Sequence, residues 1–398
     1  MLTGKTCVIP WVSVEVKPTG EFRACCLSTE DITHEGKILT ANDTLELAYR
    51  SDSMQRLRQQ FRNGEQPASC RRCWEQEAAG IVSKRENALD TFKHKLNMVD
   101  WDNDTPDQLW FLDLKLGNIC NLKCRICGTW SSSKWAQEDI EHQATVDKKS
   151  SPAYKQLKLG EWPRKSNAFW NNVEKLLPHI VLFEFTGGEP FLIREHFELL
   201  QTAVDGGYAK HINIHYNTNG TTWPANNSIW EKFGCVEIAF SIDNIGDRFN
   251  LERSGADWNE VQQNITRAQE LKQRANILLQ ACVTVNIQNV YYLDDICLWL
   301  EKQNFNSVYF NILHDPWFMS TARMTKEAQE IVLNKLRTMQ VAEHFYNDIQ
   351  GIIKFIELGT GSDGNEFRKF VKRVDEYRTE NFAETHAEIA KAMGYGQT

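Results

Sequence analysis

Three cysteines stand close together in the chain, Cys120, Cys124 and Cys127, in a C-x3-C-x2-C pattern. They follow the alternating apolar run 109–116, which predicts a β-strand, so we expect the thiols on the loop at its carboxyl end. Three such thiolates can bind three corners of an iron–sulfur cube and leave the fourth iron without a protein ligand. Chemistry can take place at an open metal position of this kind.

Zinc is the competing interpretation, because thiolates also suit zinc. A structural zinc site needs a fourth ligand, usually from a second C-x2-C or H-x3-H pair close by, and none follows Cys127 closely. On the cysteine spacing alone, both metals stay open.

A second group of cysteines precedes the first. It comprises Cys7, the adjacent pair Cys25 and Cys26, and the C-x2-C pair Cys70 and Cys73. Four ligands from this set would close an iron–sulfur cluster or a zinc site, and the sequence does not decide between Cys25 and Cys26. The other three cysteines lie in or near apolar segments and are expected to be small buried hydrophobic residues: Cys235, Cys282 and Cys297.

The first hundred residues look like a separate module. Residues 8–16 and 22–26 read as strands joined by a turn at 18–20, which is a hairpin. Residues 45–61 have helical apolar spacing, with Asn42 or Asp43 available as the cap. The stretch 97–108 is rich in Asp, Asn and Pro and reads as a linker.

Strands and helices alternate from residue 109 onward. The predicted strands are 109–116, 180–186, 211–216, 236–242, 277–285 and 307–313, and the clearest helices between them are 194–205, 258–274 and 290–303. Six β/α repeats predict a parallel sheet with right-handed crossovers, curled into a partial (β/α)6 barrel. The fold class is therefore α/β.

Two regions depart from that alternation. The polar segment 142–165 is longer than one crossover needs and is either a substrate loop or a disordered excursion. After residue 313 the pattern is helical, over 326–341, 346–356 and 365–392. We therefore expect three parts, a cluster-binding module over 1–96, a barrel over 105–318 and a C-terminal helical region over 319–398.

The cysteine spacing, together with Gly187-Gly188-Glu189-Pro190, resembles the radical S-adenosylmethionine (radical SAM) family. The resemblance implies a [4Fe-4S] cluster whose open iron binds the amino and carboxylate groups of SAM. One electron then cleaves SAM to methionine and a 5′-deoxyadenosyl radical, which abstracts hydrogen from the substrate. The chain departs from the family at Ile126, where an aromatic residue usually precedes the third cysteine.

The resemblance also implies roles for polar residues at the strand ends, where barrel sites gather. Glu189 and the backbone at Gly187 and Gly188 would hold the amino group of SAM, and Arg253, which fits better than Arg248, its carboxylate. Asn219, Ser241 and Asp243 match further family positions that contact SAM. Separately, the polar groups of Thr284 and Asn286, at the end of the fifth strand, are candidates to reach the ribose hydroxyls or the adenine. His314 is a candidate proton carrier on the substrate side, although a lone histidine is more often structural.

The N-terminal cysteines resemble the twitch domain, the half-size form of the SPASM auxiliary-cluster domain. There a cysteine precedes a hairpin, another follows its glycine, and a helix leads to further cysteines, as Gly20 to Cys25 does here. The resemblance implies an auxiliary [4Fe-4S] cluster, with zinc as the alternative. The module precedes the barrel in this chain, whereas in the relatives it follows.

Composition sets broad limits. The 398 residues carry 45 basic and 53 acidic side chains, a net charge of −8, which argues against a wholly basic nucleic-acid-wrapping protein but leaves local patches open. Eleven cysteines, an odd count, do not suit a complete disulfide framework. Without an apolar run of membrane-spanning length or a signal-peptide pattern, we expect a cytoplasmic protein that makes no membrane contact.

We expect an oxidoreductase-type enzyme that modifies a peptide or protein, with flavodoxin or ferredoxin as the reductant. One alternative keeps the radical chemistry but acts on a nucleotide, a nucleic-acid base or a sugar-like metabolite. It is motivated by a basic face of Arg50, Arg56, Arg58, Arg62, Arg71 and Arg72. Another is a non-catalytic protein with zinc at both cysteine groups. The sequence leaves open the hydrogen abstracted, whether SAM is consumed, and the oligomeric state.

Overall fold

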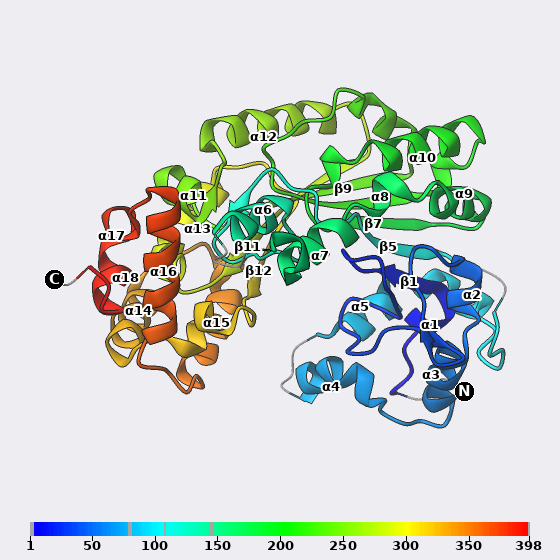
Figure 1. The fold of residues 1–398 in the computed structure, drawn as a ribbon, viewed down its shortest axis with the longest axis horizontal. Coiled ribbons are helices and arrows are strands. Elements are labelled where there is room, and N and C mark those ends of the chain that lie inside the picture. The colour runs from blue at the N-terminus through cyan, green and yellow to red at the C-terminus, as the bar shows by residue number, and fades with distance from the viewer. Residues whose placement is uncertain (1–3, 79–81, 107–108, 143–146, 397–398) are drawn as a thin grey trace. The chain divides into compact units, whose positions relative to one another are not determined.

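The structure is a computed structural model that describes residues 4–78, 82–106, 109–142 and 147–396. The chain divides into two compact units, each of which draws on separate stretches of sequence (Figure 1). Unit 1 comprises Met1–Cys120, Thr129–Tyr216 and Asn226–Val236. Unit 2 comprises Asn121–Gly128, Asn217–Ala225 and Glu237–Thr398.

Unit 1 is built on a sheet with the strand order β2-β1-β5-β7-β8. The strands are β1 (Ser13–Val16), β2 (Phe22–Arg23), β5 (Phe111–Lys115), β7 (Leu182–Thr186) and β8 (Asn213–Thr218). All neighbours pair in parallel except β1 and β2, which form the predicted antiparallel hairpin. The module strand β1 therefore continues the barrel strands directly.

Alternate residues of these strands are apolar and buried, which fixes one face of the sheet against helices. Leu112 and Leu114 of β5 are fully buried, as are Phe183 and Phe185 of β7. Phe185 stacks on Tyr216 and contacts His196 of α10. The residues between them carry the charged face described below.

The remaining elements of unit 1 are mostly short helices. They are α1 (Ile9–Val12), α2 (Leu45–Tyr49), α3 (Asp52–Arg62), α4 (Arg71–Ala78), α5 (Lys84–Thr91), α6 (Ser133–His142), α7 (Pro152–Leu159), α8 (Trp162–Lys165), α9 (Asn167–Leu176) and α10 (Arg194–Asp205). A small hairpin of β3 (Thr33–His34) and β4 (Lys37–Ile38) completes the unit.

Three local expectations in the module were wrong. The predicted strand 8–16 begins as helix α1, whose first turn contains Pro10, a residue that the first turn of a helix tolerates. The predicted helix 45–61 is two helices, because Ser51 accepts from the backbone N–H of Met54 and starts α3 anew. The cap of α2 is Thr44, rather than Asn42 or Asp43.

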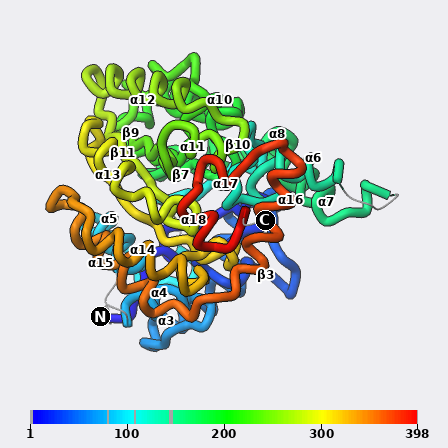
Figure 2. The backbone as a smooth tube through the Cα atoms, turned by 90° about the vertical axis from the view of Figure 1, so that its left-hand side faces the viewer, coloured from blue at the N-terminus to red at the C-terminus, as the bar shows by residue number. Residues whose placement is uncertain are grey.

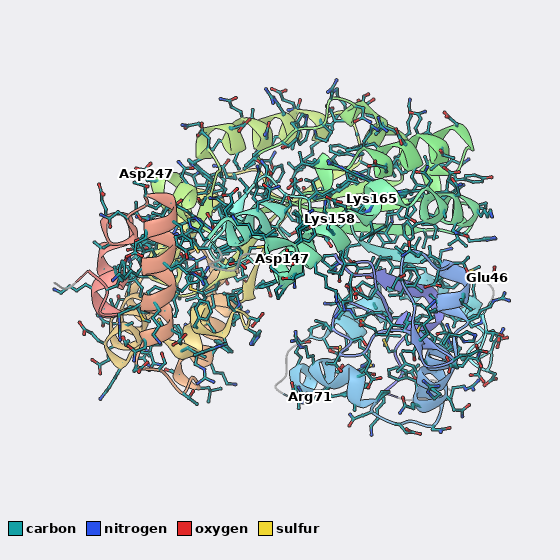
Figure 3. The ribbon with its side chains drawn as sticks, in the orientation of Figure 1. Glu46, Arg71, Asp147, Lys158, Lys165 and Asp247 are labelled. Atoms are coloured by element: carbon teal, nitrogen blue, oxygen red, sulfur yellow. The ribbon has the colours of Figure 1, made fainter. Side chains whose placement is uncertain are left out.

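The segment 142–165 was predicted to be a loop or a disordered excursion. Among its described residues, from 147 onward, it forms α7 and α8. Lys158 and Lys165, both labelled in Figure 3, pair with Glu161 between the two helices. Periodicity missed this region because polar side chains on its surface outnumber the few apolar anchors, such as Trp162.

Unit 2 contains the strand order β9-β11-β12, from β9 (Cys235–Ser241), β11 (Ile277–Val285) and β12 (Ser307–Ile312). A two-stranded antiparallel ribbon joins β6 (Lys123–Cys124) to β10 (Arg253–Ser254). The helices are α11 (Gly246–Glu252), α12 (Trp258–Lys272), α13 (Leu293–Glu301), α14 (Lys326–Thr338), α15 (Tyr346–Glu357), α16 (Asn365–Arg378), α17 (Phe382–Thr385) and α18 (Ala387–Ala392). Helices α14 and α15 pack against each other in the C-terminal part (Figure 2).

The predicted α/β class is confirmed. The six barrel strands are present as β5, β7, β8, β9, β11 and β12, mostly parallel, with small elements before them and helices after them. The three predicted region boundaries stay predictions, since each unit draws on more than one region. No helix in the described residues is long and apolar enough to cross a membrane.

Candidate functional site

Four N-terminal cysteines meet around one cavity in unit 1. Cys7 precedes α1, Cys25 follows β2, and Cys70 and Cys73 lie at the start of α4; all four line the cavity with Leu27 and Trp74. The hairpin and α4 thus bring together thiols that are far apart in sequence. Cys26 is not among the lining residues.

This arrangement suits a cluster held by four thiolates. A four-iron cluster occupies the space between its ligands, so four thiols around a cavity provide the donor set that it needs. Burial raises the pKa of Cys7, and it raises the pKa of Cys70 to about 11, so these thiols are protonated until a metal displaces the proton. In the described residues, no three His, Cys, Asp or Glu side chains form a site for a single metal ion.

Cys26 faces a different environment from that of Cys25. Burial raises the pKa of Cys26 to about 11, while the charges of Lys84 and Lys115 oppose that rise. Both lysines pair with carboxylates of the unit 1 sheet, and Lys84 also lines the cavity of the other four N-terminal cysteines.

In unit 1, Cys120 follows β5 on a loop that Ser133 holds. The hydroxyl of Ser133 accepts from the backbone N–H of Cys120 at 3.2 Å and donates to its carbonyl at 3.1 Å. Two residues earlier, the side-chain amide of Asn118 donates to the carbonyls of Thr129 and Gln156. The unexpected helix α7 therefore supports the cysteine loop.

The paired glycines allow β7 to approach this loop closely. Gly187 has φ +110°, and a Cβ on Gly188 would lie 2.3 Å from the carbonyl oxygen of Ile119. The backbone N–H groups of Gly188 and Glu189 donate to the carbonyls of Gly117 and Ile119. Close backbone contact, which only glycine permits, ties the predicted SAM turn to the residue before Cys120.

Glu189 is buried, and its carboxylate accepts from the backbone N–H of Phe191 at 3.1 Å. The side chain is thus held just after β7, at the start of the turn to α10. A carboxylate fixed in this way can accept from an ammonium group.

In unit 2, Cys124 and Cys127 lie on the loop that contains β6. Arg253 is opposite Cys124 in the β6–β10 ribbon, and its Nη1 lies 3.9 Å from the Sγ of Cys124. Burial raises the pKa of Cys124, and the Arg253 charge opposes that rise. Burial and the neighbouring Cys124 raise the pKa of Cys127 to about 12.

Asp243 orients Arg253. Its Oδ2 accepts from Nη2 of the guanidinium at 2.6 Å, and its Oδ1 accepts from the backbone N–H of Thr284 at 2.9 Å. Both side chains are buried, and Nε of Arg253 has no hydrogen-bond partner among the described residues. The orphaned donor suits a carboxylate ligand, which supports the expected role of Arg253.

Arg248, the other arginine considered, is engaged elsewhere. It forms an ion pair with Asp295, and its guanidinium lies over the ring of Tyr292 in a cation–π contact. It also lines a cavity with Trp258 and Trp299.

Within unit 2, Asn219 lies just after β8 and contacts the loop that carries Cys124 and Cys127. Its Nδ2 donates to Oδ1 of Asn121 at 3.0 Å, and Nδ2 of Asn121 donates to the hydroxyl of Thr221. Asn121, directly after Cys120 in the chain, was not predicted as a site residue. The sequence signal that could have identified Asn121 is a polar amide side chain directly after a cysteine of the motif.

The other candidates have mixed surroundings. Ser241 ends β9, and Asn286 follows β11, where its amide donates to the carbonyl of Thr284 and shapes the turn. Asn289, missed by sequence reasoning, donates to the carbonyls of Asp243 and Thr284. His314 is exposed, with its ring edge-on to Phe355 of α15.

A buried arginine in the cluster loop was also missed. Arg125 is fully buried and pairs with Asp375 of α16 and with Glu380. Its backbone N–H donates to the carbonyl of Glu252, and Arg378 donates to the carbonyl of Lys123. The loop that carries Cys124 is thereby anchored to the C-terminal helices.

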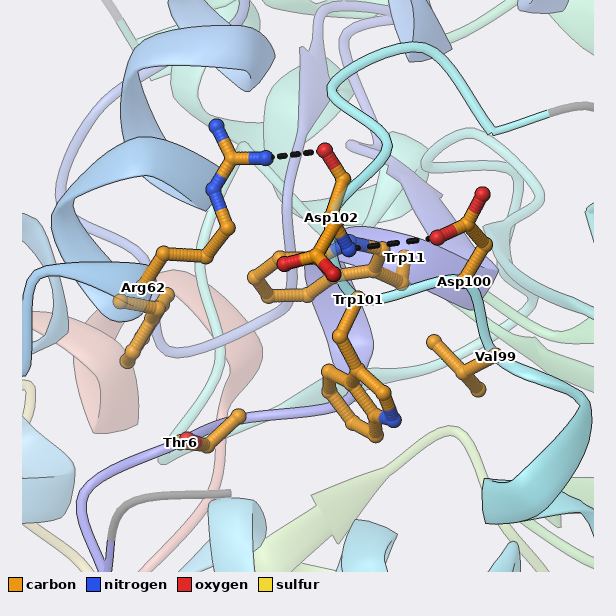
Figure 4. A pocket seen from close by; sticks show the side chains of 8 residues that line it. Thr6, Trp11, Arg62, Val99, Asp100, Trp101 and Asp102 are labelled. Carbon is orange, nitrogen blue, oxygen red and sulfur yellow. Dashed lines mark hydrogen bonds between the residues drawn. The ribbon is translucent and has the colours of Figure 1, made fainter. Parts of the chain in front are cut away.

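A second cavity in unit 1, of about 330 Å³, has no cysteine in its lining but shares Phe61 with the cysteine cavity (Figure 4). Trp11 and Trp101 line it with ring centroids 5.2 Å apart, and Arg62 donates to the carbonyl of Asp102 at its edge. None of the predicted ligands lines it.

Two segments of the chain match known families. Residues 114–290 match the Radical SAM superfamily, and residues 7–74 match the SPASM iron-sulfur cluster-binding domain. Both predicted resemblances, and the N-terminal position of the cluster domain, are confirmed. No curated protein matches the chain.

Solved structures also show similarity. Native anSMEcpe with bound AdoMet is 16% identical, with TM-score 0.37, and the match covers 61% of this chain and 62% of that one. Native anSMEcpe with bound AdoMet and Kp18Cys peptide is 17% identical, with the same TM-score and 62% coverage of both chains. The present chain thus spans about three fifths of the length of these structures.

Proposed function

Because the chain belongs to the radical SAM superfamily and carries a SPASM iron–sulfur domain ahead of the radical SAM domain, we propose that it cleaves SAM reductively and abstracts hydrogen from a peptide or protein. A [4Fe-4S] cluster, SAM and an auxiliary iron–sulfur cluster are its cofactors. The observation that carries the proposal is Arg253, whose guanidinium is fixed by Asp243 beside Cys124.

The residues have separate tasks in this proposal. Cys120, Cys124 and Cys127 would hold the cluster, which supplies the electron that breaks the sulfonium bond of SAM. Arg253 would neutralise the SAM carboxylate, and Glu189 would accept from its ammonium group. Holding the ammonium and carboxylate groups would fix the amino-acid end of SAM, and a closed site would keep water from the radical.

The N-terminal cysteines would hold the auxiliary cluster through Cys7, Cys25, Cys70 and Cys73. With four thiolate ligands, such a cluster has no open iron for substrate, so electron transfer is its expected task. His314 remains the candidate proton carrier, and a cytoplasmic setting with a flavodoxin or ferredoxin donor belongs to the same proposal.

A peptide or protein substrate is proposed by analogy with auxiliary-cluster enzymes that act on ribosomal peptides. The nucleic-acid alternative needs the six N-terminal arginines as a basic face. Arg58 is buried and donates to backbone carbonyls. Four others pair with carboxylates, namely Arg50, Arg56, Arg62 and Arg71.

Metal analysis separates this function from the zinc-protein alternative. Anaerobically purified protein is expected to contain iron and acid-labile sulfide at both cysteine groups. Zinc at both sites without acid-labile sulfide would overturn the proposal. Mass spectrometry of a co-expressed candidate peptide then tests the substrate class, while salt-dependent binding of RNA or DNA would favour the alternative.

A further inference from the structure

A row of charged side chains crosses the unit 1 sheet. The register places Glu15 of β1 beside Asp113 of β5, Asp113 beside Glu184 of β7, and Glu184 beside His215 of β8. Because residues in register across parallel strands share one face, the three carboxylates lie on the same side of the sheet. Arg23 of β2 pairs with Glu15 at the outer end of the row.

Two lysines balance these carboxylates. Nζ of Lys115 lies 3.0 Å from Oδ1 of Asp113 and 3.5 Å from Oε1 of Glu15. Nζ of Lys84 lies 3.3 Å from Oε2 of Glu184 and 3.7 Å from Oδ2 of Asp113. Oδ2 of Asp113 is buried without a hydrogen-bond partner in the described residues, so the attraction of Lys84 is what compensates it.

Lys84 also belongs to the cysteine cavity. It lines that cavity with Cys7, Cys25, Cys70 and Cys73, which none of the carboxylates of the row does. The ammonium group of Lys84 therefore contacts the row, while the same side chain lines the cavity that the auxiliary cluster would fill. The charge of that ammonium group also interacts with Cys25, one of the cavity cysteines.

The position of Lys84 is determined by the start of α5. Ser83 caps the helix and forms a capping box with Glu86, and its hydroxyl donates to Glu77 at 2.6 Å. Arg85, the next residue, also borders the cavity, but Glu77 holds its guanidinium with two hydrogen bonds. The charge of Arg85 is thus matched locally, whereas that of Lys84 is shared with carboxylates on the sheet.

Lys84 keeps its charge in this setting. Burial alone would lower the pKa of its ammonium group, but Glu184, Cys26 and Asp113 raise it well above its ordinary value. A permanent positive charge in a low-dielectric region acts strongly on any neighbouring charge.

We propose that Lys84 is a positioning residue that links the charged row to the auxiliary cluster and sets the potential at which the cluster accepts an electron. The inference rests on the proposed function, which places a cluster between Cys7, Cys25, Cys70 and Cys73. One electron makes the cluster more negative by one charge, so an adjacent cation stabilises the reduced form. Carboxylates that attract the same cation, Glu184 above all, weaken that effect.

The experiment uses the full chain with Cys120, Cys124 and Cys127 changed to Ala, so that only the auxiliary cluster is present. An anaerobic redox titration followed by electron paramagnetic resonance gives its potential. Lys84→Met is expected to make reduction at least tenfold less favourable, which for one electron is a shift of about 59 mV to more negative potential. Glu184→Gln is expected to shift the potential in the opposite direction.

The matched control is Lys93→Met, in the same module, because Lys93 is exposed, pairs with Asp90 and does not line the cavity. The equilibrium constant for reduction of its cluster should stay within twofold of the parent value. Lys84→Arg, which keeps the positive charge, should retain a potential close to that of the parent, without most of the shift expected for Lys84→Met. The inference is overturned if Lys84→Met behaves like the control. If Lys84→Met does not fold, an unchanged potential in Glu184→Gln overturns it equally.

Failure of the proposed function gives a different result. In that case the parent protein, with its four N-terminal cysteines intact, would contain no iron or acid-labile sulfide. A cluster that is present, but whose potential ignores both substitutions, contradicts the role of Lys84 alone.

Discussion

Arg253 lies opposite Cys124 in the β6–β10 ribbon, with its Nη1 3.9 Å from the cysteine Sγ. The guanidinium is directed by Asp243 and retains a buried Nε without a partner in the described part of the chain. A cation that is fixed beside a proposed cluster ligand, and still has a donor to offer, suits a carboxylate that binds at the same cluster.

Replacing Arg253 should weaken SAM binding. Hydrogen bonds to charged groups contribute about 1.5–3 kcal/mol, so Arg253→Gln is expected to raise the Kd for SAM by roughly 10- to 100-fold. Arg248→Gln is the matched control, since Arg248 pairs with Asp295 and should leave the Kd within about twofold. Equal effects of the two substitutions, measured by titration of the reconstituted protein, would contradict the assignment.

The auxiliary ligand set predicts different outcomes for two adjacent cysteines. Cys25 lines the cavity and Cys26 does not, so Cys25→Ala should lose the auxiliary iron while Cys26→Ala retains it. Iron and sulfide analysis, in the background that lacks Cys120, Cys124 and Cys127, measures this directly. Loss of iron in Cys26→Ala with normal iron in Cys25→Ala would reverse the ligand assignment.

Substitution of Gly188 should disturb the loop of Cys120. An Ala Cβ would lie 2.3 Å from the carbonyl oxygen of Ile119, and backbone on both sides cannot relax cheaply. We expect Gly188→Ala to destabilise the protein by about 1–3 kcal/mol in urea unfolding and to reduce iron bound at Cys120.

Gly351 provides the comparison, because an added Cβ there meets nothing within 4 Å inside helix α15. Gly351→Ala should stabilise the protein by about 0.5–1 kcal/mol. A stabilising effect of Gly188→Ala would contradict the close approach of β7 to the cysteine loop.

His196 should make the protein less stable in acid. Burial lowers its pKa to about 3 in the folded state, against about 6.5 in the unfolded chain. The contribution of neutral His196 to the free energy of unfolding is therefore complete above pH 6.5. It is lost as the pH falls from 6.5 toward 3, because the unfolded state binds the proton first. At pH 5 the loss is about 2 kcal/mol.

The measurement compares the free energy of unfolding of the wild-type protein and His196→Gln at pH 7.5 and pH 5. Gln can keep a contact to the hydroxyl of Tyr216, which His196 approaches at 3.2 Å, but it does not titrate. The acid loss should therefore be about 2 kcal/mol smaller in the variant, and an identical loss in both proteins would contradict this prediction.

Much of the fold could be predicted from local patterns. Strand β11 and helix α10 have the predicted boundaries, because their apolar periodicity is uninterrupted. Apolar periodicity failed where one residue ends a helix and caps the next, as Ser51 does between α2 and α3. It also failed where a polar helix packs through few apolar side chains, as α7 does.

Sequence reasoning could propose site residues only where a motif names them. Cysteine spacing and the Gly187-Gly188-Glu189 turn identify themselves, whereas Arg125 is an arginine like any other until α16 surrounds it with Asp375 and Glu380. Likewise, strand register alone aligns Glu15, Asp113 and Glu184, and register depends on contacts far apart in sequence.

The most direct measurement of the central claim is the yield of 5′-deoxyadenosine from the anaerobically reconstituted chain with SAM and a strong reductant. We predict its formation by the wild-type protein and its absence in Cys124→Ala, while Cys235→Ala, a substitution outside both ligand sets, forms it normally. A wild-type protein with its iron and sulfide in place that forms no 5′-deoxyadenosine, with or without candidate peptides, would contradict the account.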